Sequence, residues 1–179
     1  WGGWFYGFVD ARKVGFGIRP DEAADIASFL QKVGVALREQ VTIEHPYDSA
    51  INKIDLGAFP FLTLDPEEGS NAHRFANMMP GGRIDRSPCG TGAAARAAIL
   101  HARGRMAIGE EHIAYSITNA EFRINLREEK NVQGSCVVLP EITGRAFIYG
   151  TSQLGVNPED PYQMGISLSD MWAEAARGC

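Results

Sequence analysis

The stretch Asp85-Arg86-Ser87-Pro88-Cys89-Gly90-Thr91-Gly92 decides the expected fold, because an alanine-rich segment that predicts a helix follows it directly. It places the thiol of Cys89 at a helix entrance, where backbone N–H groups are free and the helix dipole is positive. Such an entrance binds anions, and its field lowers the pKa of a cysteine thiol, so the sulfur can act as a base or nucleophile. The other interpretation of Cys89 is a small buried hydrophobic residue before an ordinary helix.

The same loop offers groups to both ends of an amino acid. Gly90 lets the backbone approach a bound group closely, and Thr91 adds a hydroxyl beside the free N–H groups. Asp85 is placed to accept a hydrogen bond from an ammonium group. The chemistry that this arrangement predicts is abstraction of an α-proton by the thiolate of Cys89, with the carboxylate of the ligand held by N–H groups.

A dinucleotide-binding loop is the main competing interpretation of these glycines. Gly90-x-Gly92-x-x-Ala95 fits that fingerprint in its spacing. However, Pro88 and the charged pair before it stand where the fingerprint needs a buried apolar strand. We therefore set the dinucleotide interpretation aside.

The composition is that of an ordinary globular protein and excludes several functions. The 179 residues carry a net charge of −5 with scattered basic residues, which argues against nucleic-acid binding. No apolar run is long enough to span a membrane. Because the three cysteines, Cys89, Cys136 and Cys179, are widely spaced, we expect no disulfide framework and no metal-binding cluster, and a cytoplasmic location.

Residue patterns predict a mixed α+β fold in which strands outnumber helices. Helices are expected over residues 20–37, where apolar residues recur at helical spacing, and over 93–103. The expected strands are 5–9, 58–64 (with a proline typical of an edge strand), 72–79, 111–126, 132–139 and 144–150.

The motif around Cys89 resembles the second catalytic motif of the proline racemase and hydroxyproline epimerase family. The resemblance extends over essentially the whole chain, because further stretches recur in the family's order. These are Gly2-Gly3-x-Phe5-Tyr6-x-x-Val9-Asp10-Ala11, His45-Pro46, Arg74-x-x-Asn77, Arg96 with His101-Ala102-Arg103-Gly104, Gly144-Arg145-Ala146 and Asp160-Pro161-Tyr162.

This resemblance implies specific roles for the loop. Cys89 would be one of two opposed cysteines that act as acid and base on either face of an α-carbon. Asp85 would contact the substrate, and Gly90 and Thr91 would bind its carboxylate through their N–H groups. The implied reaction is racemisation or epimerisation of proline or hydroxyproline, with no cofactor and no metal. The implied fold is a diaminopimelate-epimerase-like lobe, with strands curled around a central helix at about 93–103.

The resemblance also implies that half of the site is missing. The family's first motif, a Cys-Gly-His-Gly-type loop in an N-terminal half, has no counterpart here. Cys136, in Gly134-Ser135-Cys136-Val137-Val138, is typical of a strand interior, and Cys179 is terminal. We therefore expect residues 1–145 to form the second lobe of a two-lobed enzyme, and residues 146–179 to pack partly on the missing N-terminal lobe. The isolated half is expected to be inactive, and a homodimer is a further expectation.

Phe61 and Met79 indicate different substrates. Phe61 aligns with a histidine that hydroxyproline epimerases of the family tend to carry, and an apolar ring suits unsubstituted proline better. Met79-Pro80-Gly81 is more similar to the Cys-Pro-Gly of the epimerases than to the phenylalanine typical of the racemases. Both substrates stay open at this stage. The alternative function is a truncated or pseudoenzyme half that binds a small carboxylate without catalysis.

Overall fold

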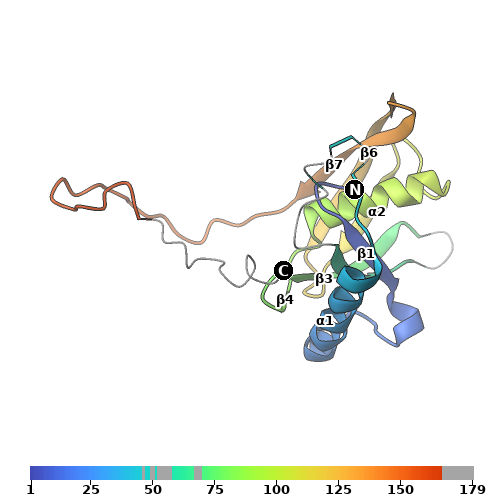
Figure 1. Ribbon diagram of the computed structural model, residues 1–179, viewed down its shortest axis with the longest axis horizontal. Coiled ribbons are helices and arrows are strands. Elements are labelled where there is room, and N and C mark those ends of the chain that lie inside the picture. The colour runs from blue at the N-terminus through green and yellow to red at the C-terminus, as the bar shows by residue number, and fades with distance from the viewer. Residues whose placement is uncertain (46, 49–50, 52–57, 67–69, 167–179) are drawn as a thin grey trace.

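A mixed β-sheet is the framework of the chain in the computed structural model, which describes residues 1–45, 47–48, 51, 58–66 and 70–166 (Figure 1). The strands are β1 (Tyr6–Asp10), β2 (Phe59–Leu64), β3 (Ala72–Met79), β4 (Arg83–Ile84), β5 (Glu111–Tyr115), β6 (Glu121–Val132) and β7 (Ser135–Gly144). They pair in the order β1-β2-β3-β5-β6-β7, and β4 pairs with β3. β1 is parallel to β2 and β3 to β5, whereas β2–β3, β5–β6 and β6–β7 are antiparallel.

Two α-helices cover opposite faces of this sheet. α1 (Ala23–Gln40) packs Ile26 and Leu30 in a cluster with Leu62 of β2, whereas α2 (Gly90–Ala102) packs in a cluster with Phe61 of the same strand. Because neighbouring residues of a strand point to opposite faces, Phe61 and Leu62 assign the two helices to different sides. Short 3₁₀ turns, η1 (Ala11–Val14) and η2 (Pro20–Glu22), lead from β1 into α1.

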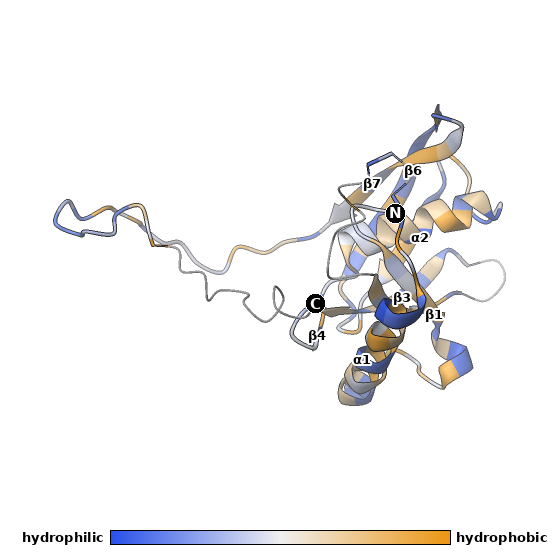
Figure 2. Cartoon of the chain, in the orientation of Figure 1, coloured by the Kyte–Doolittle hydropathy of each residue, from blue (hydrophilic) through white to orange (hydrophobic). Residues whose placement is uncertain are grey.

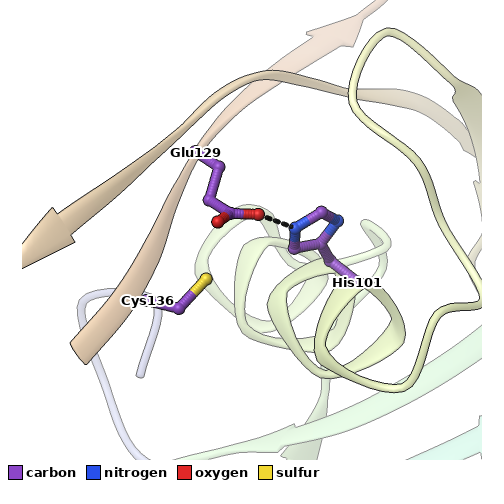
Figure 3. A group of neighbouring side chains, drawn as sticks. All are labelled: His101, Glu129 and Cys136. Atoms are coloured by element: carbon purple, nitrogen blue, oxygen red, sulfur yellow. Dashed lines mark hydrogen bonds and ion pairs between the residues drawn. The ribbon is translucent and has the colours of Figure 1, made fainter. Parts of the chain in front are cut away.

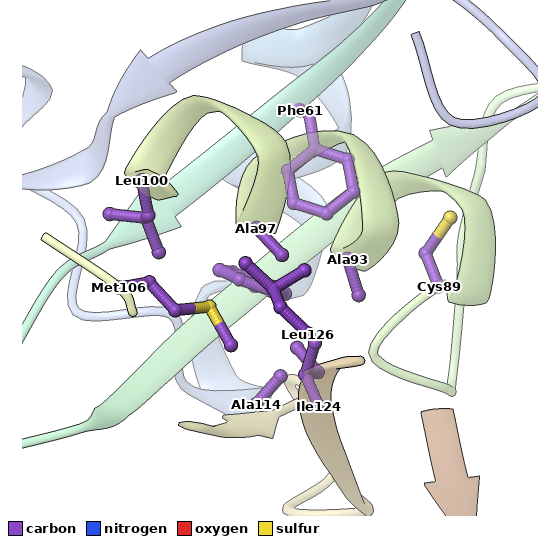
Figure 4. Packing of buried hydrophobic residues seen from close by; sticks show 10 residues of the cluster. Phe61, Cys89, Ala93, Ala97, Leu100, Met106, Ala114, Ile124 and Leu126 are labelled. Atoms are coloured by element: carbon purple, nitrogen blue, oxygen red, sulfur yellow. The ribbon is translucent and has the colours of Figure 1, made fainter. Parts of the chain in front are cut away.

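The sheet curls around α2, which confirms the expected strands around a central helix (Figure 4). Residues of β1, β2, β3, β5, β6 and β7 all pack in the cluster that contains α2, namely Tyr6, Phe8, Phe61, Phe75, Ala114, Ile124, Leu126, Val138 and Ile142. The helix begins at Gly90 rather than at residue 93, so the glycines of the loop belong to its first turn. Small residues make this close approach possible, since a Cβ on Gly92 would lie 2.3 Å from Cε2 of Phe61.

The first helix and the central strands follow the predictions closely. α1 begins three residues later than expected, because Glu22 accepts hydrogen bonds from the N–H groups of Gly17 and Arg19 and closes the preceding turn. β3 has the predicted bounds. β2 is flanked by β1 and β3, so its interpretation as an edge strand was wrong. Pro60 is tolerated there because the pairing of β2 with β3 begins only at Phe61.

Three strand predictions in the C-terminal half were wrong in detail. Residues 111–126 form two strands, β5 and β6, separated by a turn in which Asn119 has a positive φ of 62°. The predicted strand 132–139 becomes β7 at 135–144, because the hairpin turn takes Gln133 and Gly134. Residues 144–150 form no strand beyond Gly144.

The segment after β7 leaves the sheet and extends away from it (Figures 1 and 2). Residues 145–166 carry neither helix nor strand, and all of them are exposed. Large apolar side chains are among them: Phe147, Ile148, Tyr149, Leu154, Val156, Tyr162, Met164 and Ile166. The predicted domain boundary at 145/146 thus falls where the sheet ends, and packing on another lobe stays a prediction. Residues 167–179, with Cys179, lie outside the described part of the chain. No helix of the described residues is long and apolar enough to cross a membrane.

Candidate active site

Cys89 stands at the N-terminal entrance of α2 in an unusual backbone conformation. Its φ of 64° and ψ of 105° lie in a region that residues other than glycine rarely adopt, and its side chain is buried. Holding a cysteine there costs about 1–3 kcal/mol, so the surrounding contacts must enforce it. Such strain is common where a side chain is aimed at a ligand, and it favours the functional interpretation of Cys89 over that of a simple hydrophobic residue.

Successive hydrogen bonds from Asp85 to Cys89 stabilise the turn before Cys89. Oδ1 of Asp85 accepts from the backbone N–H of Ser87 at 2.8 Å and from its hydroxyl at 2.9 Å. The Ser87 hydroxyl oxygen in turn accepts from the N–H of Cys89 at 3.1 Å. Asp85 is therefore a turn-forming residue in this structure, and its contact with a substrate stays a prediction.

Two polar groups of the sheet contact the sulfur of Cys89. Nδ2 of Asn77, on β3, lies 3.4 Å from Sγ, and the hydroxyl of Tyr6, on β1, lies 3.5 Å from it. Asn77 is 3% exposed, so its amide is held in place by the core. The sulfur of Cys89 is therefore in contact with polar groups of two different strands, β1 and β3.

The hydroxyl of Tyr6 also lies 2.5 Å from that of Thr91, in the first turn of α2. Burial of the phenol raises the pKa of Tyr6 far above its usual value, so the group keeps its proton and remains a donor. The tyrosine thereby couples the first turn of α2 to the sulfur.

The first turn of α2 offers an anion site beside this sulfur. The N–H groups of Gly90, Thr91 and Gly92 have no carbonyl four residues earlier within the helix. The first intrahelical bond is donated by Ala93 to the carbonyl of Cys89, at 2.8 Å. The predicted cradle of Gly90 and Thr91 therefore lies next to the predicted base, and a carboxylate bound there also gains from the helix dipole.

The two residues predicted to select the substrate occupy different environments. Phe61 is fully buried under α2, with its ring against Gly92 and Tyr6, so it presents no surface to a ligand in this structure. Met79 is 45% exposed, and its sulfur lies 3.5 Å from Nδ2 of Asn77. The structure thus brings Met79 to the same amide as Cys89 and leaves Phe61 in the core below.

Sequence reasoning missed Tyr6 and Asn77, although both lie in stretches that carried the resemblance. Tyr6 begins β1 and Asn77 lies within β3, and each contributes a polar atom whose partner is Cys89, 83 and 12 residues away along the chain. A polar side chain at an inward-facing strand position was the one available signal, since such a group needs a buried partner.

A curled mixed sheet around a helix that begins at a strained cysteine defines a lobe of the diaminopimelate-epimerase type. The sequence profile of the proline racemase family matches residues 1–167, and the chain belongs to that family.

The chain is similar to curated proteins that are named 4-hydroxyproline 2-epimerases. The chain is 35% identical over 176 residues to a 4-hydroxyproline 2-epimerase of Allorhizobium ampelinum and 36% identical to 4-hydroxyproline 2-epimerase 1 of Rhizobium rhizogenes. In both cases the match covers 98% of this chain but only 49% and 50% of the relative. The chain therefore spans about half the length of these relatives.

Solved structures agree in fold and in coverage. A hydroxyproline epimerase from Agrobacterium vitis, with bound trans-4-hydroxy-L-proline, has a TM-score of 0.75 and 35% identity, covering 99% of this chain and 50% of its own. A probable proline racemase from Agrobacterium radiobacter K84, with bound carbonate, gives the same TM-score and identity over 51% of its own chain. In both cases this chain matches about half of the solved chain.

Proposed function

We propose that this chain supplies one of the two acid/base cysteines of an enzyme that inverts the α-carbon of proline or hydroxyproline. The observation that carries the proposal is the position of the Cys89 sulfur, between two side-chain donors and the free N–H groups of a helix entrance. The relatives named as 4-hydroxyproline 2-epimerases support the substrate class.

In this mechanism the residues of the chain have separate tasks. The N–H groups of Gly90 and Thr91 bind the substrate carboxylate and stabilise the negative charge that spreads into it when the α-proton leaves. The thiolate of Cys89 accepts that proton and becomes a thiol. Asn77 and Tyr6 donate to the sulfur while it is charged, and a thiol on the other lobe delivers a proton to the opposite face of the α-carbon.

The second thiol has to come from outside the described residues. Cys136 cannot serve, because it neighbours His101 in the last turn of α2 whereas Cys89 precedes the first. The 13 residues of α2 separate these ends by about 18 Å. We therefore propose that this half alone is inactive, and that the apolar residues of 145–166 pack on the lobe that holds the second cysteine. A second subunit of a homodimer is the other possible source of that thiol.

Met79 is the residue that we propose to line the substrate ring, because it is the exposed member of the two candidates. Its apolar side chain accepts either ring, so both substrates belong to the proposal.

The test is interconversion of stereoisomers by the two-lobed protein that carries this chain, followed by polarimetry. Both L-proline and trans-4-hydroxy-L-proline are offered, and Cys136→Ser serves as the matched thiol control. We expect turnover of at least one of them, lost in Cys89→Ser and retained in Cys136→Ser. Binding of these amino acids without any turnover would support instead the alternative function of a carboxylate-binding domain.

A further inference from the structure

Three side chains with metal-binding atoms converge at the C-terminal end of α2, away from Cys89 (Figure 3). They are His101 of α2, Glu129 of β6 and Cys136 of β7, and one nitrogen, oxygen or sulfur atom of each lies within 4.8 Å of the other two. These residues are far apart in the sequence, so the earlier expectation of no metal-binding cluster, which rested on spacing, overlooked the group. Cys136 lies in a strand, as predicted, since it is the second residue of β7, and its side chain is exposed.

The fold presents the two hairpin residues on one face. Asn131 pairs with Cys136 and Glu129 pairs with Val138, so Glu129 and Cys136 are diagonal neighbours on the same side of the β6–β7 ladder. That side faces α2, which brings His101 over both of them (Figure 3).

The imidazole of His101 is already oriented as a metal ligand. Its Nδ1 lies 2.8 Å from the carbonyl oxygen of Met106, so Nδ1 carries the proton that the carbonyl accepts. This leaves Nε2 directed at the cluster, where it lies 2.7 Å from Oε2 of Glu129. Metal-binding histidines commonly donate their second ring N–H to a backbone carbonyl in this way.

The carboxylate of Glu129 pairs with His101 and also accepts a hydrogen bond from the Cys136 thiol, so the three side chains contact one another without a metal. The case for a metal is that one nitrogen, one oxygen and one sulfur ligand atom converge at one place. A tetrahedral zinc site places its ligand atoms roughly 3.5 Å apart. Binding therefore widens the 2.7 Å contact between His101 and Glu129, and it shortens any separation near the 4.8 Å limit by about 1 Å. The side chain of Glu129 is 51% exposed and free to make that movement.

A groove beside the cluster leaves room for a further ligand. It has a volume of about 600 Å³ and is lined by Ala94, Ala98 and His101 of α2 and by Cys136 and Val138 of β7. A water molecule or a small anion can complete four-fold coordination from this side.

We propose that His101, Glu129 and Cys136 bind a divalent transition metal of the zinc class. Imidazole and thiolate ligands select zinc over magnesium or calcium, which prefer oxygen. Because the ligands come from α2 and from both strands of the hairpin, the metal ties the hairpin to the helix. It therefore stabilises this end of the lobe and takes no part in proton transfer at Cys89.

The experiment uses Co²⁺ as a spectroscopic substitute for Zn²⁺ in a background in which Cys89 and Cys179 are serine, so that Cys136 is the one remaining thiol. We expect d–d bands of tetrahedral intensity together with a thiolate-to-cobalt charge-transfer band, both displaced by added Zn²⁺. A spectrum of octahedral aqueous cobalt, without the charge-transfer band, would overturn the proposal.

Single substitutions then assign the ligands. His101→Gln, Glu129→Gln and Cys136→Ser should each raise the dissociation constant for Zn²⁺ by more than the roughly 10- to 100-fold that loss of an outer hydrogen-bond partner costs. Glu128→Gln is the matched control, since Glu128 adjoins Glu129 but pairs with Lys130. Unchanged zinc affinity in all three ligand variants would contradict the site, even if the chain binds zinc elsewhere.

Discussion

The amide nitrogen of Asn77 donates a hydrogen bond to the sulfur of Cys89 across 3.4 Å, from the middle of a strand to the entrance of a helix. The same amide nitrogen lies 3.5 Å from the sulfur of Met79. Oδ1 of Asn77 is buried and has no hydrogen-bond partner in the part of the chain that the structure describes. The hydrogen bonds of this side chain are therefore made by Nδ2, which points toward the sulfur atoms of Cys89 and Met79. Cys89 is the candidate base.

Asn77→Leu tests this contact. The variant keeps a similar volume but removes the donor, and loss of a hydrogen bond to a charged group costs about 1.5–3 kcal/mol. We expect the rate at which iodoacetamide alkylates Cys89 at neutral pH to fall about tenfold or more. Asn71→Leu, on an exposed loop, is the control and should leave the rate unchanged. An unaltered rate in Asn77→Leu would show that the amide does not support the thiolate.

Tyr6→Phe separates the hydroxyl from the aromatic ring. The ring packs with Phe8 and Phe61 and is retained. The hydroxyl has two hydrogen-bond partners, Thr91 and Cys89, so the free energy of unfolding should fall by about 1–3 kcal/mol. Alkylation of Cys89 should slow by several-fold, because the phenol no longer donates to Sγ. Denaturant unfolding and alkylation kinetics on the same sample distinguish the two effects. A loss of stability without any change in alkylation would assign Tyr6 to the core alone.

Gly92→Ala probes the packing of α2 against the sheet. The added methyl would lie 2.3 Å from Cε2 of Phe61, so we expect a loss of about 1–3 kcal/mol in the free energy of unfolding. Gly90→Ala is the matched control, because nothing lies within 4 Å of a Cβ there. The double variant Gly92→Ala/Phe61→Leu should recover part of the loss. Equal stability of the two alanine variants would contradict this packing.

Acid should destabilise the chain in two steps. Burial lowers the pKa of His112 below its usual 6.5, so the unfolded state binds more protons and stability falls as the pH drops through about 6.5. Asp65 accepts hydrogen bonds from His73, Arg96 and Arg105, which hold its pKa far below the usual 3.8. Its contribution is complete above about pH 4 and is lost below.

Urea unfolding at a series of pH values checks both steps. Asp65→Asn should flatten the decline below pH 4, and the decline between pH 6.5 and 5 should persist in that variant. The hydrogen bond to Glu129 raises the pKa of His101, which opposes the His112 effect, so the comparison is made in a His101→Gln background. A stability of that variant that is independent of pH between 7 and 5 would refute the assignment of His112.

Local patterns predicted the elements that are decided by neighbouring residues. α1 follows from apolar spacing and α2 from the alanine-rich segment after the loop, and β3 has the predicted bounds. The positions of Cys89, Gly90 and Thr91 follow from one continuous loop. The expected strand 144–150 was wrong because an apolar run such as Phe147-Ile148-Tyr149 forms a strand only where a partner edge or face covers it. In the described part of the chain none does.

Contacts between elements could not be predicted from the sequence. The donors to Cys89 depend on the curl of the sheet, which brings β1 and β3 to the same helix entrance. The grouping of His101 with Glu129 and Cys136 depends on the register of a hairpin whose turn was misplaced by the prediction. A shift in strand register changes the partners of every side chain in that strand. A misplaced hairpin turn therefore prevents the prediction of any site that the hairpin forms.

The most direct test of the central claim, that Cys89 removes the α-proton, is deuterium exchange at the α-carbon. The chain is completed by the second cysteine-bearing lobe that the proposal requires and is incubated in D₂O with each enantiomer of proline and with trans-4-hydroxy-L-proline. The α-proton signal is followed by NMR. We predict exchange by the native protein and a loss of at least about 100-fold in Cys89→Ser, with substrate binding retained. Exchange by Cys89→Ser at the native rate would contradict the account.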